Sequence, residues 1–224
     1  MMLRVRAGLT AAGLLAALLL PGAGAAQDYQ TSVAWGGGYF QFQPFVDAGD
    51  DAPADLGFGG TWVAILQAEN WQFNHWVGLR LGGFLSQGSI DYPSGALDHT
   101  IYGIEAAGLV RVVPPRPERR VSAYLLGGGG VTWFSLGDGS GEVPIPGTNA
   151  VYDTDEARQY VALAGGGVEM MTGFRFFDGD LGVRAEAIDN IAFGRPIHAA
   201  DDDGGMMHNL RFTIALFTGV PPLF

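Results

Sequence analysis

Apolar and polar residues alternate over much of the chain, and residues 210–217 (LRFTIALF) show this pattern most plainly. A period of two places successive side chains on opposite faces of a β-strand. One face of this segment is uniformly apolar and carries Leu210, Phe212, Ile214 and Leu216. Alternation alone does not say which face meets the surroundings, or whether those surroundings are water or lipid.

Eight segments have this strand pattern, and turn residues such as glycine, proline and aspartate separate them. They are residues 33–47, 56–69, 73–86, 98–113, 121–136, 158–172, 181–193 and 207–220. Most exceed the roughly five or six residues usual in soluble sheets, and they match the length that a tilted strand needs to cross a bilayer. Short and long connections alternate between them. This order predicts an all-β fold, an eight-stranded antiparallel up-and-down barrel.

The two faces of the predicted strands indicate the solvent. In residues 98–113, Ile104 and Val110 share an apolar face, whereas Glu105 and Arg111 lie on the opposite face among glycine and alanine. A soluble sheet would need many charged side chains on its water-facing side. Small residues with isolated charges suit the cramped interior of a narrow barrel, so we expect a transmembrane barrel whose apolar face points into lipid. A soluble lipocalin-like barrel is the alternative. In the glycine-rich fifth and sixth segments, the pattern does not show which side chains point outward.

Aromatic residues near the ends of the predicted strands support the membrane interpretation. Transmembrane barrels carry aromatic girdles close to both membrane surfaces. Six side chains are predicted to belong to such girdles: Trp35, Tyr39, Trp62, Trp71, Tyr102 and Trp133.

The N-terminus has the pattern of a secretory signal peptide. Arg4 and Arg6 precede an apolar run at residues 9–20, and a proline and several small residues follow. The run is too short to span a bilayer as a helix. We therefore expect residues 1–26 to be a cleaved signal peptide and residues 27–224 to form one barrel domain. An uncleaved N-terminal membrane anchor is the alternative.

Composition narrows the range of partners. The full chain has a net charge of −11, and removal of the two arginines of the signal peptide would make it −13 (−11 − 2). This balance argues against nucleic acid as a partner. The chain contains no cysteine, which excludes a disulfide framework and a lipid-modified cysteine.

Together these features resemble the small eight-stranded outer-membrane barrels of the OmpA/OmpX-like group. The signal peptide, the long alternating strands and the final Phe224 carry the resemblance. It implies export to the outer membrane of a Gram-negative bacterium, outer-membrane lipids as surroundings, and recognition of the last strand by the barrel-insertion machinery. The apolar row of that strand keeps one parity from Leu210 to Val220 and Phe224, and Pro221-Pro222 departs from the family pattern.

Charged residues on the small-residue face predict an interior network of Arg80, Glu105, Arg111, Arg184, Glu186 and Arg211, with Glu69 at the rim. An isolated charge inside a narrow barrel is costly, so these groups must be paired. We expect Arg184 and Glu186 to pair with Glu105 and Arg211. Such pairs would plug the lumen. The alternative is a narrow, porin-like channel for ions or small solutes, lined by the same side chains.

Other candidate chemistry is sparse. Carboxylates that could hold Ca²⁺, or could simply be solvated loop tips, cluster in the longer connections: Asp47, Asp50, Asp51, Asp55, Asp153, Asp155, Glu156, Asp201, Asp202 and Asp203. None has the spacing of a calcium loop, so we predict no metal site and no cofactor. No His-x-Ser pairing involves the four histidines, His75, His99, His198 and His208. His99 lies near Asp98 and Ser94 in a predicted loop, where such neighbours are common by chance.

These observations favour a non-catalytic outer-membrane barrel with a structural or surface-interaction role. A narrow channel is the second interpretation, and a lipid-modifying outer-membrane enzyme is the third. No motif in the connections identifies a loop partner.

Overall fold

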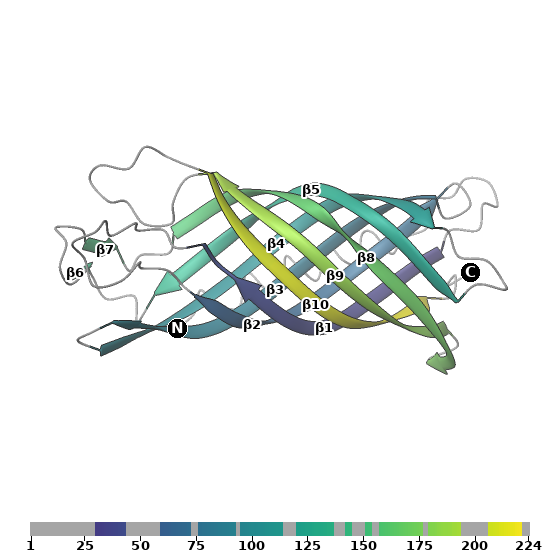
Figure 1. The fold of residues 1–224 in the computed structure, drawn as a ribbon, viewed down its shortest axis with the longest axis horizontal. Helices are drawn as coiled ribbons and strands as arrows, with labels where there is room; N and C mark the ends of the chain where they lie inside the picture. The colour runs from purple at the N-terminus through teal and green to yellow at the C-terminus, as the bar shows by residue number, and fades with distance from the viewer. Residues whose placement is uncertain are drawn as a thin grey trace, which may run out of the picture.

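The computed structural model describes residues 30–43, 59–72, 76–92, 95–113, 120–136, 142–144, 151–153, 157–176, 179–193 and 206–220. The predicted signal peptide, residues 1–26, lies outside them. Within these ranges, no helix is long and apolar enough to cross a membrane. Figure 1 shows an elongated barrel of tilted strands.

The barrel contains eight antiparallel strands: β1 (Gln30–Gln41), β2 (Gly60–Gln72), β3 (Val77–Tyr92), β4 (Gly95–Val113), β5 (Val121–Leu136), β8 (Ala157–Phe176), β9 (Gly179–Phe193) and β10 (Met206–Val220). Each barrel strand pairs with the next, and β1 pairs with β10 to close the sheet. Two short strands, β6 (Glu142–Pro144) and β7 (Val151–Asp153), form a separate hairpin in the connection from β5 to β8. The predicted all-β, eight-stranded antiparallel barrel is confirmed.

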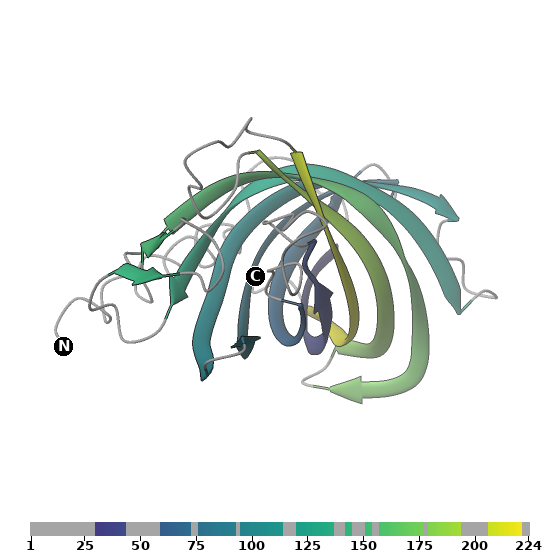
Figure 2. The same cartoon turned by 60° about the vertical axis from the view of Figure 1, so that its left-hand side comes forward.

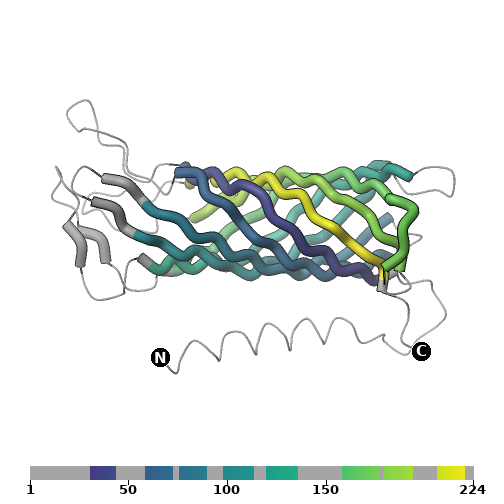
Figure 3. Tube along the Cα trace, turned by 90° about the horizontal axis from the view of Figure 1, so that it is seen from below, coloured from purple at the N-terminus to yellow at the C-terminus, as the bar shows by residue number. Residues whose placement is uncertain are grey.

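Closure of the sheet fixes the tilt of the strands, which Figure 3 shows crossing the barrel obliquely. Cross-strand partners followed once around the barrel lead from Thr31 to Gln41 of the same strand, a stagger of ten residues (41 − 31). The path passes through Asn70, Leu79, Gly108, Gly127, Ala164, Asp189 and Leu210. For eight strands this stagger corresponds to a tilt of about 40°.

The hairpin of β3 and β4 is longer than the sequence pattern predicts. The pattern predicts a loop at residues 87–97, but cross-strand pairing continues to Tyr92 and Gly95. Pairing between β2 and β3 ends at Ser86, so the last part of this hairpin extends beyond the barrel wall. Strands outside a membrane need no lipid-facing apolar row, which is why alternation does not mark them.

Side chains alternate between the interior and the outer wall of the barrel. The buried residues of β10 include Arg211, Thr213, Ala215 and Phe217. The exposed residues of the same strand include Leu210, Phe212, Ile214 and Leu216, the four that the sequence predicts to face lipid. The structure also decides the facing of the glycine-rich strands β5 and β8. Tyr124 and Leu163 are buried inside, whereas Leu125 and Val168 are exposed outside.

Glycines on the inner face allow neighbouring strands to approach closely. A Cβ atom at Gly38 would collide with the carbonyl oxygen of Phe212 in β10, and one at Gly128 would collide with that of Ala106 in β4. The tight curvature of a narrow barrel therefore requires glycine at these positions.

Candidate functional site

Buried charged side chains form one connected series across the interior, which we call the interior ion-pair chain. In order, it consists of Arg111, Glu169, Arg184, Glu69, Arg80 and Glu186. The N–O distances of its five links are 2.9, 2.6, 2.6, 2.5 and 2.6 Å. Each of the four inner members contacts two groups of opposite charge, which offsets the cost of removing these charges from water.

Arg184 of β9 lies in the middle of the interior ion-pair chain and has no exposed surface (0%). Its Nη2 donates to Glu69 Oε2 and to Glu169 Oε1, each at 2.6 Å. Its Nη1 donates to Gln67 Oε1 at 3.1 Å. The planar guanidinium group thus holds acceptors on two strands, β2 and β8, in charge-assisted hydrogen bonds.

Tyr124 of β5 links the last two members of the interior ion-pair chain. Its hydroxyl accepts a hydrogen bond from Arg80 Nη2 at 2.9 Å and donates one to Glu186 Oε1. Gln67 Nε2 donates to the other oxygen of Glu186 at 3.1 Å. The Glu186 carboxylate therefore accepts hydrogen bonds from two neutral side chains in addition to its ion pair with Arg80.

Every strand of the barrel supplies a hydrogen-bonding side chain to this network. The contributing residues are Ser32 (β1), Gln67 and Glu69 (β2), Arg80 (β3), Arg111 (β4), Ser122 and Tyr124 (β5), Glu169 (β8), Arg184 and Glu186 (β9), and Thr213 (β10). Ser32 and Thr213 make the longest of these contacts, at 3.4 Å. The network therefore ties together the whole circumference through the lumen.

A second interior ion pair lies apart from the first network. Arg211 of β10 donates through Nη2 to both carboxylate oxygens of Glu105 in β4, at 2.7 Å each. The Arg211 guanidinium lies 5.0 Å from the ring centre of Phe84 and 5.8 Å from that of Phe40. Phe40 stacks on Phe42 with 4.2 Å between ring centres. Aromatic side chains thus fill the interior near the end of β1.

The structure buries all six interior charges named from the sequence, but it pairs them differently. The predicted partners of Arg184 and Glu186 are wrong. Arg184 contacts Glu69 and Glu169, and Glu186 contacts Arg80. Glu105 and Arg211, the partners predicted for them, pair with each other. Contacts across the lumen depend on the stagger of the closed sheet, which alternation along single strands does not reveal.

Two residues of β2 lie elsewhere than predicted. Glu69 is 2% exposed and belongs to the middle of the interior ion-pair chain, not to the rim. Trp71, predicted for an aromatic girdle, is 1% exposed inside the barrel. Its Nε1 donates to Glu69 Oε2 at 3.2 Å, and the Arg111 guanidinium lies 3.7 Å from its ring centre. Both residues share the parity of the buried Ile65 and Gln67, a signal that would have placed them inside.

Exposed apolar side chains cover the outer wall. Those between 48% and 66% exposed include Leu79, Ile104, Leu125, Val168 and Ile214. On β4 the outward row runs from Tyr102 to Val112. Ten residue steps of about 3.3 Å, tilted by about 40°, span roughly 25 Å, the height of the apolar band of an outer-membrane barrel.

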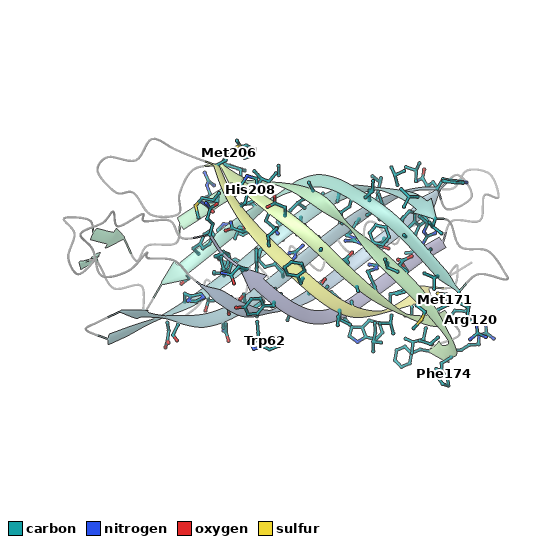
Figure 4. The ribbon with its side chains drawn as sticks, in the orientation of Figure 1. Trp62, Arg120, Met171, Phe174, Met206 and His208 are labelled. Atoms are coloured by element: carbon teal, nitrogen blue, oxygen red, sulfur yellow. The ribbon has the colours of Figure 1, made fainter. Side chains whose placement is uncertain are left out.

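Aromatic pairs lie on this wall near its edges. Their ring centres are 6.3 Å apart for Tyr39 and Trp62, 5.5 Å for Tyr102 and Trp133, and 5.9 Å for Trp35 and Phe176. Figure 4 shows Trp62 projecting away from the outside of the barrel.

The polarity of the two faces decides the class of protein. A soluble barrel presents charged side chains to water and keeps apolar ones inside, whereas this barrel has ion pairs inside and an apolar band outside. A closed barrel can lie in hydrocarbon because it leaves no strand edge unpaired. The described strands therefore form a small eight-stranded transmembrane β-barrel, the architecture typical of outer-membrane barrels. In outer-membrane barrels the short turns commonly face the periplasm and the longer connections face the exterior, and we expect the same orientation here.

Comparisons with known proteins give distant structural similarity. No protein-family model matches the sequence, and the search of curated proteins finds no relative. Ail, the attachment invasion locus protein of Yersinia pestis, in complex with the heparin analogue sucrose octasulfate, is 11% identical with a TM-score of 0.47, over 85% of this chain and 99% of that one. Neisserial surface protein A is 10% identical with a TM-score of 0.42, over 86% and 96%. The outer membrane protein OprG from Pseudomonas aeruginosa is 13% identical with a TM-score of 0.41, over 84% and 95%.

Most of the candidate loop chemistry lies outside the described residues. This applies to His75, His198, Pro221-Pro222, Phe224, Asp47, Asp50, Asp51, Asp55, Asp155, Glu156, Asp201, Asp202 and Asp203, whereas Asp153 lies in β7. His99 is buried in β4. His208 is exposed on the outer wall, with Nδ1 2.7 Å from Asp189 Oδ2. Across the ten described ranges, no group of three His, Asp or Glu side chains is arranged to hold a metal ion.

Proposed function

We propose that this outer-membrane barrel is non-catalytic and has a closed lumen, and that it supports the membrane structurally or binds partners through its extracellular loops. The observation that carries the proposal is the interior ion-pair chain together with the hydrogen bonds around it, a network to which all eight strands contribute. An eight-stranded barrel encloses a space only just wide enough for its own side chains. Arg80, Arg111 and Arg184 extend across that space with their carboxylate partners.

Passage of an ion would require these contacts to open. Removing one partner of a buried ion pair costs about 3–5 kcal/mol, and here several pairs share their members. The Arg211–Glu105 pair and the rings of Phe40 and Phe84 form a second obstruction. These two layers support a lumen that stays closed without a separate plug domain.

Conductance in a planar bilayer tests the proposal. We expect the wild-type protein to give no steady conductance above that of a mock preparation. Replacing Arg80 and Glu186 together by alanine leaves the net charge unchanged and removes one end of the interior ion-pair chain, so this variant should leak. The matched control removes the exposed pair Arg175 and Asp180, 3.9 Å apart, and should stay silent. Reproducible wild-type single-channel steps would overturn the closed-lumen proposal.

A narrow channel for ions or small solutes is the second candidate function. It is favoured by buried donors that have no hydrogen-bond partner among the described residues, namely Arg80 Nη1 and Arg211 Nε and Nη1. Buried polar atoms of this kind commonly bind ordered water. A line of such waters would provide a path through the interior, and the same bilayer recordings would then show steps in the wild-type protein.

Among the described residues, no hydroxyl group hydrogen-bonds to His208, which supports a non-catalytic role over lipid modification. Hydrolysis of a lipid ester by a histidine commonly uses a serine or another nucleophile within hydrogen-bonding reach. Within the described ranges, the imidazole of His208 hydrogen-bonds to Asp189 and to no hydroxyl group.

Assembly of the barrel is proposed to use β10. Its outward row from Leu210 to Leu216 is exposed and apolar, and the strand closes the barrel by pairing with β1. We propose recognition of this strand by the barrel-insertion machinery, with outer-membrane lipids as the other partner of the row.

A further inference from the structure

The β8–β9 hairpin extends past its neighbour β5 at the periplasmic rim. Pairing between β5 and β8 reaches only to Met170, and a hydrogen bond from Met171 N to Arg120 O, at 2.8 Å, follows directly after it. The pairing of β8 with β9 shifts between Met171 and Arg175, and Gly173 in this interval has a φ of +83°. Figure 2 shows the end of β8 turning sharply away from the line of the strand.

This irregular turn brings two guanidinium groups to the rim. The Arg120 side chain lies over Gly173, because a Cβ atom there would be 3.7 Å from Arg120 Nη1. Arg120 is exposed, and no carboxylate among the described residues forms an ion pair with it. The side chain of Arg175 is 72% exposed, and its Nε lies 3.9 Å from Asp180 Oδ1. A long, exposed pair of this kind contributes little to stability, and the Arg120 guanidinium adds a second positive charge beside it.

Apolar and aromatic side chains adjoin these two arginines. Phe174 precedes Arg175 in the turn and is 71% exposed. Phe176 packs against Trp35 on the outer wall, and Met170 ends the outward apolar row of β8. Figure 4 shows Arg120, Met171 and Phe174 together at this end of the barrel. The turn therefore lies where the apolar wall meets the periplasm.

We propose that Arg120, Arg175 and Phe174 form a binding site for an anionic phospholipid of the periplasmic leaflet. The guanidinium groups bind its phosphate, because their planar donors match phosphate oxygens. Phe174 inserts beside the acyl chains, the position that aromatic side chains favour at membrane interfaces. The distribution of charge along the sequence also favours an anionic ligand at this end of the barrel. In the sequence, Arg116 and Arg119, with one acidic residue, Glu118, precede Arg120, whereas the longer connections at the other end are mostly acidic. The site does not depend on whether the lumen is closed.

Native mass spectrometry of the folded full-length barrel in detergent tests this site, with phosphatidylglycerol as the added lipid. Changing both Arg120→Gln and Arg175→Gln should weaken binding by about tenfold, since each basic residue near a lipid headgroup adds to the attraction. The matched control is Arg158→Gln. Arg158 lies at the opposite end of β8, the strand that also contains Arg175, and its exposed guanidinium is 6.0 Å from the centre of the Tyr160 ring. Its replacement should change binding less than twofold.

Further measurements distinguish lipid binding from binding of free phosphate and from an effect of misfolding. Uncharged diacylglycerol should bind to the wild-type protein and to the double variant with the same affinity. Inorganic phosphate should not displace phosphatidylglycerol. Gel mobility before and after heating reports the folded fraction of each variant, and Arg120→Lys should fold fully with a smaller loss of affinity. The proposal is overturned if folded double variant binds phosphatidylglycerol as tightly as wild type, if Arg158→Gln causes the same loss, or if inorganic phosphate displaces the lipid.

Discussion

Arg184 of β9 and Glu69 of β2 are joined across the barrel, with 2.6 Å between Nη2 and Oε2, although β10 and β1 lie between their strands in the sheet. The contact therefore crosses the lumen instead of following the wall. Both side chains are buried, so neither charge can turn to water if its partner is lost.

Loss of Arg184 should destabilise the barrel strongly. Arg184→Ala leaves Glu69 and Glu169 without their shared partner, and we expect the free energy of unfolding to fall by about 3–5 kcal/mol. Urea titration in lipid vesicles, followed by gel mobility, measures this change. The control Arg158→Ala removes an exposed arginine from β8 and should change stability by less than about 0.5 kcal/mol. Equal, small losses in both variants would show that Arg184 is solvated.

Introduced cysteines should report which side chains face lipid, because the natural chain contains none. A cysteine at Phe212, on the outer wall, should react slowly with water-soluble thiol reagents and should be quenched by lipid-borne probes once labelled with a fluorophore. Ser89 is exposed on the part of β3 beyond the pairing with β2, so Ser89→Cys should react rapidly. Similar reaction rates at the two positions would contradict the facing of β10.

Tryptophan fluorescence should distinguish the wall from the interior. Trp62 is exposed on the outer wall and Trp71 is buried beside Glu69 and Arg111. In vesicles of brominated lipid, Trp62→Phe should therefore reduce the quenched share of the emission, whereas Trp71→Phe should increase it. A quenched share that falls with Trp71→Phe would place Trp71 in the girdle predicted from the sequence.

Inner-face glycines should differ from outer-face glycines in their tolerance of a methyl group. Gly38→Ala would force a Cβ against the Phe212 carbonyl oxygen and should lower the folded yield after refolding into detergent. Gly108→Ala should refold like wild type, because its Cβ would lie 3.8 Å from the nearest carbonyl oxygen, that of Gly127. Heat-dependent gel mobility measures both yields, and normal refolding of the Gly38 variant would refute the close approach of β1 and β10.

Alternation along single strands was enough to identify the barrel strands and many of their inward and outward side chains from the sequence alone. The row from Leu210 to Leu216 identified β10 and its outward face, and Arg80 and Arg184 were placed on the inner face of their strands. The same reasoning applied to β2 would have placed Trp71 inside. This information is local, because the period of a strand fixes which side chains share a face before any strand has found its neighbours.

The tertiary structure decided which interior groups meet. Arg184 and Glu69 are 115 residues apart in the chain, and they come together only because the sheet closes with a stagger of ten residues between Thr31 and Gln41. The stagger sets the height of each side chain in the lumen, and no single strand contains it. The position of the Arg120 side chain over Gly173 likewise depends on the irregular end of β8, where the regular period of two is interrupted.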